Sequence, residues 1–109
     1  MFTITDNPTF AHVVKAHVPV DGGHRVDEFR ATFRVIATEA MAAYDLATEA
    51  GTRDFLVAAI VRLDELADDR KEPVPYSDAI RDQVIGLPYA RIALVRAYVE
   101  GVTRGRSGN

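Results

Sequence analysis

The chain has 109 residues, of which 48% are hydrophobic and 27% are charged, with a net charge of −3 and no cysteine. These values are typical of one globular domain, and they exclude a disulfide framework, a thiolate metal site and a cysteine nucleophile. The weak negative charge supplies no general attraction to nucleic acid or to an anionic membrane. No stretch of about 18 apolar residues is present to span a bilayer.

The N-terminal part of the chain is predicted to form β-strands. Phe2 to Thr5 alternates apolar and polar residues before a turn at Asp6-Asn7-Pro8, which favours a short first strand. The stretches 10–20 and 29–35 show the same period of two, and Gly22-Gly23 between them permits the positive φ angles of a tight turn. We expect these two strands to form an antiparallel hairpin with one face on the core and the other in water.

Two helices are predicted after the hairpin. The first spans residues 38–50, because this stretch is rich in alanine, with Thr38 as its N-cap and Gly51 as its C-cap. The second has Thr52 as its N-cap and extends to Leu66. Its apolar residues recur at helical spacing and form one stripe, which consists of Leu56, Ala59, Ile60, Leu63 and Leu66. We expect this stripe to face the core.

The C-terminal part is predicted to be a loop followed by two helices. Pro73 and Pro75 disfavour helix in residues 67–76. Ser77 can cap a short helix over residues 78–85, and Pro88 suits the first turn of the last helix, where its missing N–H costs nothing. The last helix has an apolar face made of Ile92, Val95, Val99 and Val102, widened by Tyr89, Leu94 and Tyr98.

Together these elements predict an α+β fold, with an N-terminal antiparallel hairpin of two or three short strands followed by about four helices. We expect a single compact domain over residues 1–102, with its strands within 2–36 and its helices within 38–102. Residues 103–109 contain no apolar side chain, so we expect them to form a flexible tail.

Candidate catalytic and metal-binding groups are few. His12 and His17 are an odd number of residues apart on one strand, so they point to opposite faces and cannot share a metal. Ser77 followed by Asp78 is the pattern of a helix start. The acids of residues 64–69 lack the spacing of a calcium loop. We therefore predict no catalytic residue, no cofactor-binding residue, no metal ligand and no enzymatic activity.

Three blocks of the chain carry a resemblance to a known family. They are the hairpin TFAHVVKAHVPVDGGHRVDEFRATFRV, the segment FLVAAIVRLDEL and the block PVPYSDAIRDQVIGLPYARIALVRAYVEGV. In this order they resemble the small tail assembly chaperones of long-tailed bacteriophages and prophages. The resemblance covers nearly the whole chain from Thr9 to Val102.

The resemblance implies a protein that performs no chemistry. Chaperones of this family bind the long, helical tape measure protein and keep it soluble while tail tube subunits assemble around it. They work in the cytoplasm of the bacterial host, which the absence of cysteine fits, and they are absent from the mature particle. No cofactor, nucleic acid or membrane is expected as a partner.

Two further partners are expected: the resemblance implies the tail tube protein, and the uneven charge, acidic from Asp64 to Asp82 and basic from Tyr89 onward, favours contacts between copies of the chain. Many such families also make a longer product by a programmed ribosomal slip near the end of the gene, and its extension recruits the tail tube protein. Codons for Gly108-Asn109 could contain the slippery heptamer, which the nucleotide sequence would show. Copies of the chain are also expected to associate with one another.

We place the expected partner-binding groove between the second and last predicted helices. Apolar side chains of these two helices would cover the helix faces of the tape measure protein, while the charged loop 68–72 stays in water. The predicted partner-binding residues are Leu56, Ile60, Leu63, Tyr89, Ile92 and Tyr98.

Two other classes of protein remain open at this point. A virion structural protein, such as a tail completion or head-tail connector protein, would be retained in purified particles, where mass spectrometry would find it. A small enzyme is the less favoured alternative, because it would need a deep pocket with converging polar groups.

Overall fold

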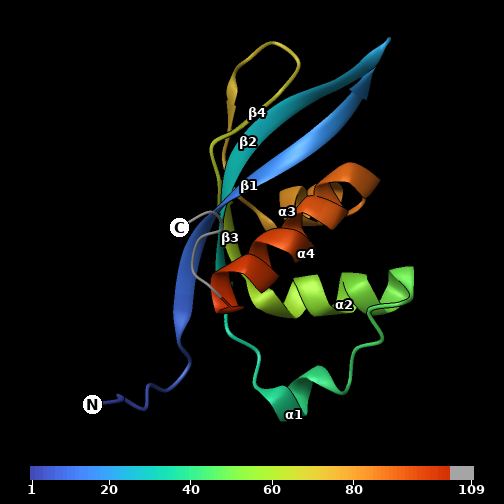
Figure 1. Cartoon of the computed structure of the whole chain (residues 1–109). Helices are drawn as coiled ribbons and strands as arrows, with labels where there is room; N and C mark the ends of the chain where they lie inside the picture. The colour runs from blue at the N-terminus through green and yellow to red at the C-terminus, as the bar shows by residue number, and fades with distance from the viewer. Residues whose placement is uncertain (104–109) are drawn as a thin grey trace.

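The structure is a computed structural model that describes residues 1–103 (Figure 1). In chain order its elements are β1 (Thr9–Val20), β2 (Gly23–Arg34), α1 (Thr38–Met41), α2 (Glu49–Ala59), β3 (Ile60–Asp64), β4 (Leu66–Ala67), β5 (Pro73–Val74), α3 (Asp78–Ile85) and α4 (Pro88–Thr103). The predicted α+β fold, with an N-terminal antiparallel hairpin and about four helices, is confirmed. The predicted flexible tail lies outside the described residues except for Thr103, which ends α4.

The hairpin of β1 and β2 is the scaffold of the fold. A two-residue turn, Asp21-Gly22, joins the strands, and Gly22 has a φ of 82°, a conformation that glycine adopts without strain. Val14 on β1 pairs with Phe29 on β2, and both side chains are buried on the same face of the sheet. The predicted alternation of core-facing and solvent-facing residues is therefore present.

The predicted long helix over residues 52–66 is wrong in its second half. Helix α2 ends at Ala59, and the next residues form β3, which pairs antiparallel with β2. Ile60 and Leu63 are buried in this strand, as they would be in a helix. A shift in register between Thr32 and Phe33 keeps both on the core face. Residues 60–64 form a strand because the free edge of β2 supplies hydrogen-bond partners for their backbone, which the sequence pattern does not reveal.

The alanine-rich helix predicted over residues 38–50 is also wrong. Only α1, a single turn, forms there, because the stretch has few large side chains to bury and propensity alone does not sustain a short helix. The N-cap of α2 is Thr48, whose hydroxyl accepts a hydrogen bond from the N–H of Gly51. Gly51 is therefore in the first turn of α2 and not a C-cap, and Thr52 lies inside the helix.

Four further local predictions are resolved. Phe2 to Thr5 is not a strand, and the predicted loop 67–76 contains the short β4–β5 pair. Ser77 does cap α3, since its Oγ accepts a hydrogen bond from the N–H of Ile80 at 3.1 Å. Pro88 does begin α4.

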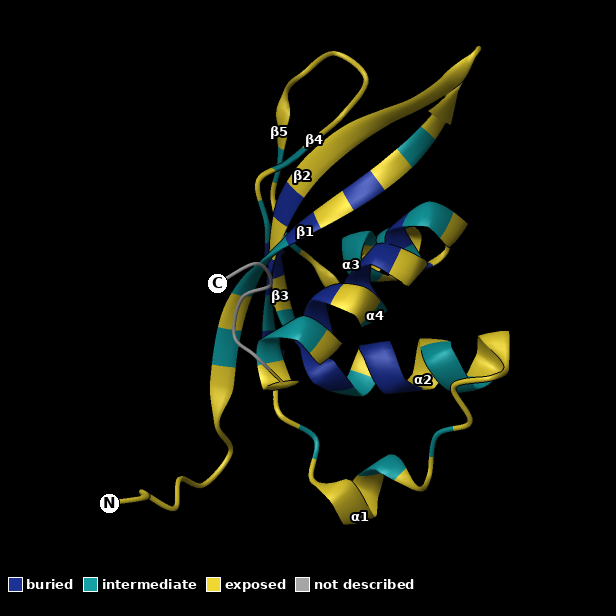
Figure 2. Cartoon of the chain, in the orientation of Figure 1, coloured by how far each residue is buried: buried dark blue, intermediate teal, exposed yellow. Residues whose placement is uncertain are grey.

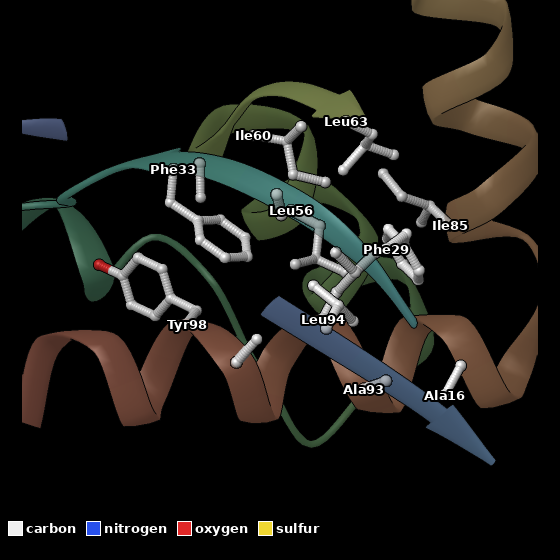
Figure 3. Packing of buried hydrophobic residues seen from close by; sticks show 14 of the residues in the cluster. Ala16, Phe29, Phe33, Leu56, Ile60, Leu63, Ile85, Ala93, Leu94 and Tyr98 are labelled. Carbon is white, nitrogen blue, oxygen red and sulfur yellow. The ribbon is translucent and has the colours of Figure 1, made fainter. Parts of the chain in front are cut away.

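The core lies between one face of the three-stranded sheet, in the order β1-β2-β3, and helices α2, α3 and α4 (Figure 3). Aromatic rings form its centre. The ring centroids of Phe55 and Tyr98 are 4.9 Å apart, and those of Phe33 and Tyr98 are 5.5 Å apart, both in edge-to-face geometry. The tip of the hairpin extends beyond this core and is exposed (Figure 2).

Candidate interaction site

One side of α4 is buried against the sheet. Ala93 and Ala97 are small and buried where α4 packs along β1, and Leu94 and Tyr98 enter the core. Small side chains on this side allow the helix axis to approach the strand closely. At Gly101 the approach is so close that a Cβ would overlap the ring of Phe10 on β1.

The opposite side of α4 is also apolar. Four residues spaced three and four apart share one helix face there: Ile92, Val95, Val99 and Val102. Ile92 is 58% exposed and Val99 is 47% exposed, whereas Val95 is half-buried. Figure 2 shows α4 changing between buried and exposed residues along its turns. We call these four residues the outer stripe; Val95 packs partly against the core, and Ile92, Val99 and Val102 are exposed.

A shallow hollow of about 370 Å³ lies beside the N-terminal half of the outer stripe. Leu46, from the loop before α2, and Thr52 of α2 form one wall, and Ile92 and Val95 form the other. Leu46 is itself exposed. The hollow therefore extends the apolar surface of α4 across to the start of α2.

Two arginines flank the outer stripe, Arg91 on one side and Arg96 on the other. Arg91 approaches Glu49 with an Nη1–Oε1 distance of 4.0 Å, which is a loose ion pair. Arg96 is exposed and makes no ion pair with any described residue. An apolar stripe between two cations is complementary to an apolar helix face that is flanked by carboxylates.

The groove predicted from the sequence is occupied by the protein's own core. Leu56, Ile60, Leu63 and Tyr98 are all buried, so the prediction that they form a surface for a partner needs correction (Figure 3). The pattern that suggested a partner surface is the pattern that packs the chain on itself. Of the six predicted residues, Tyr89 is half-buried and packed against the core, and Ile92 is exposed on the outer stripe.

Sequence reasoning placed three outer-stripe residues, Val95, Val99 and Val102, on one helix face but did not select them as contacts. A signal was present, because α4 has apolar residues on two faces and a core needs only one. Leu46 could not have been found, because only the folded chain brings its loop beside Ile92.

The shifted pKa values belong to surface ion pairs away from the outer stripe. A hydrogen bond from Arg25 lowers the pKa of Asp27 on the hairpin, and a hydrogen bond to Asp64 raises the pKa of Arg62. Within residues 1–103 no three histidine, cysteine or acidic side chains group as a metal site would require.

His12 and His17 are five residues apart on β1, so their side chains lie on opposite faces of the sheet, as the sequence predicts. The ring Nδ1 of His12 lies 2.7 Å from the carbonyl oxygen of Val13, so it has a partner within the chain. Among the described helices, none combines the length and apolar character needed to cross a membrane.

In comparisons with known proteins, no family model, no curated protein and no solved structure matches this chain.

Proposed function

We propose that this protein is a phage tail assembly chaperone that binds the tape measure protein through the outer stripe of α4. The observation that carries the proposal is the exposure of Ile92 and Val99 on one face of α4, with Arg91 and Arg96 beside Ile92. The sequence resemblance supplies the class of partner, and the outer stripe supplies a place for it.

The proposed mechanism is the covering of apolar helix faces. Full burial of an isoleucine or valine contributes roughly 1.5–3 kcal/mol, and association itself costs several kcal/mol of translational and rotational freedom. One copy on a short segment would therefore bind weakly. Many copies along a long helical partner would keep its apolar faces out of water, which fits a helper that tail tube subunits displace during assembly.

The remaining parts of the proposal concern where and with what the protein acts. We place it in the cytoplasm of the bacterial host and outside the finished particle. A product extended by ribosomal slippage would contact the tail tube protein, and copies of the chain would associate with one another. The charged loop 68–72 is exposed and would face water in such complexes.

Co-expression with the tape measure protein of the same phage or prophage tests the proposal. The soluble fraction of the tape measure protein is measured with the unchanged chain and with Ile92→Glu/Val99→Glu. The double variant is expected to lose most of this solubilisation and to bind at least roughly tenfold more weakly, because it places two charges in the centre of the contact.

The control variant is Val26→Glu at the hairpin tip. Val26 is 51% exposed, between Val99 and Ile92, so it matches them in chemistry and exposure but lies on another surface. Equal solubilisation by all three proteins would refute binding through the outer stripe. Abundant peptides of this chain in purified particles would instead favour a virion structural protein.

A further inference from the structure

Residues 2–5, which we call the arm, have no regular secondary structure and no backbone hydrogen-bond partner within the described chain. Phe2 and Ile4 are 90% and 88% exposed, and they alternate with threonines as the residues of a half-buried strand do. The chain bends between the arm and β1, where Asn7 has a φ of 51°. Figure 1 shows the arm leading away from the sheet and the helices. A strand-like segment of this kind gains its hydrogen bonds by joining the edge of a sheet.

The outer edge of β1 is such an edge. Val20 and Gly23 close a two-residue turn and form a hydrogen-bonded pair, so the even-numbered residues of β1 bond to β2. The N–H of Val35 donates a hydrogen bond to the carbonyl oxygen of Pro8, with an N–O distance of 2.9 Å. Pro8 is also an even-numbered residue, so the pattern continues to the start of β1. The backbone groups of odd-numbered residues therefore point away from β2. Pro19 is at an odd position, where its missing N–H costs the sheet nothing.

The open part of this edge runs from Thr9 to His17. Among residues 1–103 no other strand pairs with it. One outward carbonyl, that of Val13, lies within hydrogen-bond distance of the ring of His12. The other outward backbone groups of this stretch have no backbone partner within the described chain.

A hollow of about 610 Å³ adjoins the open edge. Its apolar lining consists of Val13 and three small side chains, Ala11 on β1 and Ala93 and Ala97 on α4. Its charged lining has both signs: Lys15, Arg30 and Arg96 are cationic, and Glu28 and Glu100 are acidic. Small side chains leave room for large ones, and the arm carries two large ones in Phe2 and Ile4.

We propose that the arm of one copy adds as an extra strand to the open edge of β1 in a second copy. Phe2 and Ile4 would enter the hollow over Ala93 and Ala97. Asp6 is the only acid in the first 20 residues, and it would meet Lys15 or Arg96 at the rim. Each copy has one arm and one edge, so two copies can exchange arms about a two-fold axis. The exchange gives a structural form to the self-association named in the proposed function. Because it uses neither Ile92 nor Val99, its loss can be distinguished from loss of binding to the tape measure protein.

Light scattering across a dilution series of the full chain tests the exchange with three variants. Phe2→Asp/Ile4→Asp disables the arm, and it leaves the fold intact because these side chains are exposed. Ala11→Pro disables the edge by removing an N–H that points away from β2. Like the natural Pro19, it lies at an odd-numbered position, so the pairing with β2 is kept. Both proteins are expected to be monomeric where the unchanged chain associates, with unaltered circular dichroism. Val26→Asp, which places the same charge at a 51% exposed site on the hairpin tip, is expected to associate normally.

Mixing the two disabled proteins gives the decisive observation. The Ala11→Pro protein keeps its arm and the Phe2→Asp/Ile4→Asp protein keeps its edge, so the mixture can form one contact and is expected to yield a heterodimer. A mixture that stays monomeric would overturn the exchange in favour of an arm that folds back on its own sheet. An unchanged chain that is monomeric at every concentration would overturn it as well, and so would association that survives loss of the arm.

Discussion

At Gly101, α4 passes directly against the ring of Phe10, and no larger residue fits there. The ring of Phe10 also packs on Phe33 and Tyr98, with centroid distances of 5.4 and 5.9 Å, so it has little freedom to move aside. A glycine inside a helix normally weakens the helix by about 1 kcal/mol relative to alanine. Here the close approach of helix and strand outweighs that loss.

Gly101→Ala is therefore expected to lower the free energy of unfolding by about 1 kcal/mol. The helix gains about 1 kcal/mol in propensity, but overpacking against Phe10 costs about 1–3 kcal/mol. Urea denaturation measures the change. In a Phe10→Ala background, where the ring is absent, the same substitution is expected to stabilise the chain, and a loss of stability there would contradict this account.

At the scale of elements, the helix ends are set by single polar side chains. The hydroxyl of Thr48 caps α2, and the hydroxyl of Ser77 caps α3. The first turns of these helices also contain an acid, Glu49 and Asp78, where the helix dipole favours negative charge. These caps decide where each helix begins, because they supply acceptors for N–H groups that have no partner within the helix.

Ser77→Ala is expected to cost about 1 kcal/mol of stability, since it leaves the N–H of Ile80 without its acceptor. Urea denaturation of the full chain measures the loss. Ser77→Asp, which restores an acceptor at the same position, is the control and is expected to recover most of it. Unchanged stability in Ser77→Ala would show that the cap contributes nothing.

At the scale of the whole molecule, Tyr98 joins the separate layers of the fold. Its ring packs against Phe10 of β1, Phe33 of β2 and Phe55 of α2. Figure 3 shows Tyr98 beside Phe33. Its hydroxyl accepts a hydrogen bond from the N–H of Ile36, at 3.0 Å, just after the end of β2. One side chain of α4 thus contacts both strands of the hairpin and α2, and it is a core residue, not a partner contact.

Two substitutions separate these roles of Tyr98. Tyr98→Phe keeps the ring but leaves the partly buried N–H of Ile36 unbonded, and it is expected to cost about 1 kcal/mol. Tyr98→Ala also removes the ring and is expected to cost about 3–5 kcal/mol, as aromatic residues in cores do. Thermal and urea unfolding measure both. A similar cost for the two variants would show that the ring packing contributes little.

The sequence by itself determined the hairpin and the two C-terminal helices, because several local signals agree there. In the hairpin, a period of two on either side of Gly22-Gly23 coincides with a turn that glycine permits. In α3 and α4, Ser77 and Pro88 mark the starts, and apolar residues recur at helical spacing. Such signals act over a few residues and need no knowledge of the rest of the chain.

Only the tertiary structure decided the middle of the chain and the candidate site. Either a helix or a strand would bury Ile60 and Leu63. The strand forms because β2, once paired with β1, has a free edge with which residues 60–64 can pair. Either apolar side of α4 could face the core. The side with Ala93, Ala97 and Gly101 does so, because small residues let the helix approach β1. That packing leaves the outer stripe exposed, and a local pattern cannot show which face remains uncovered.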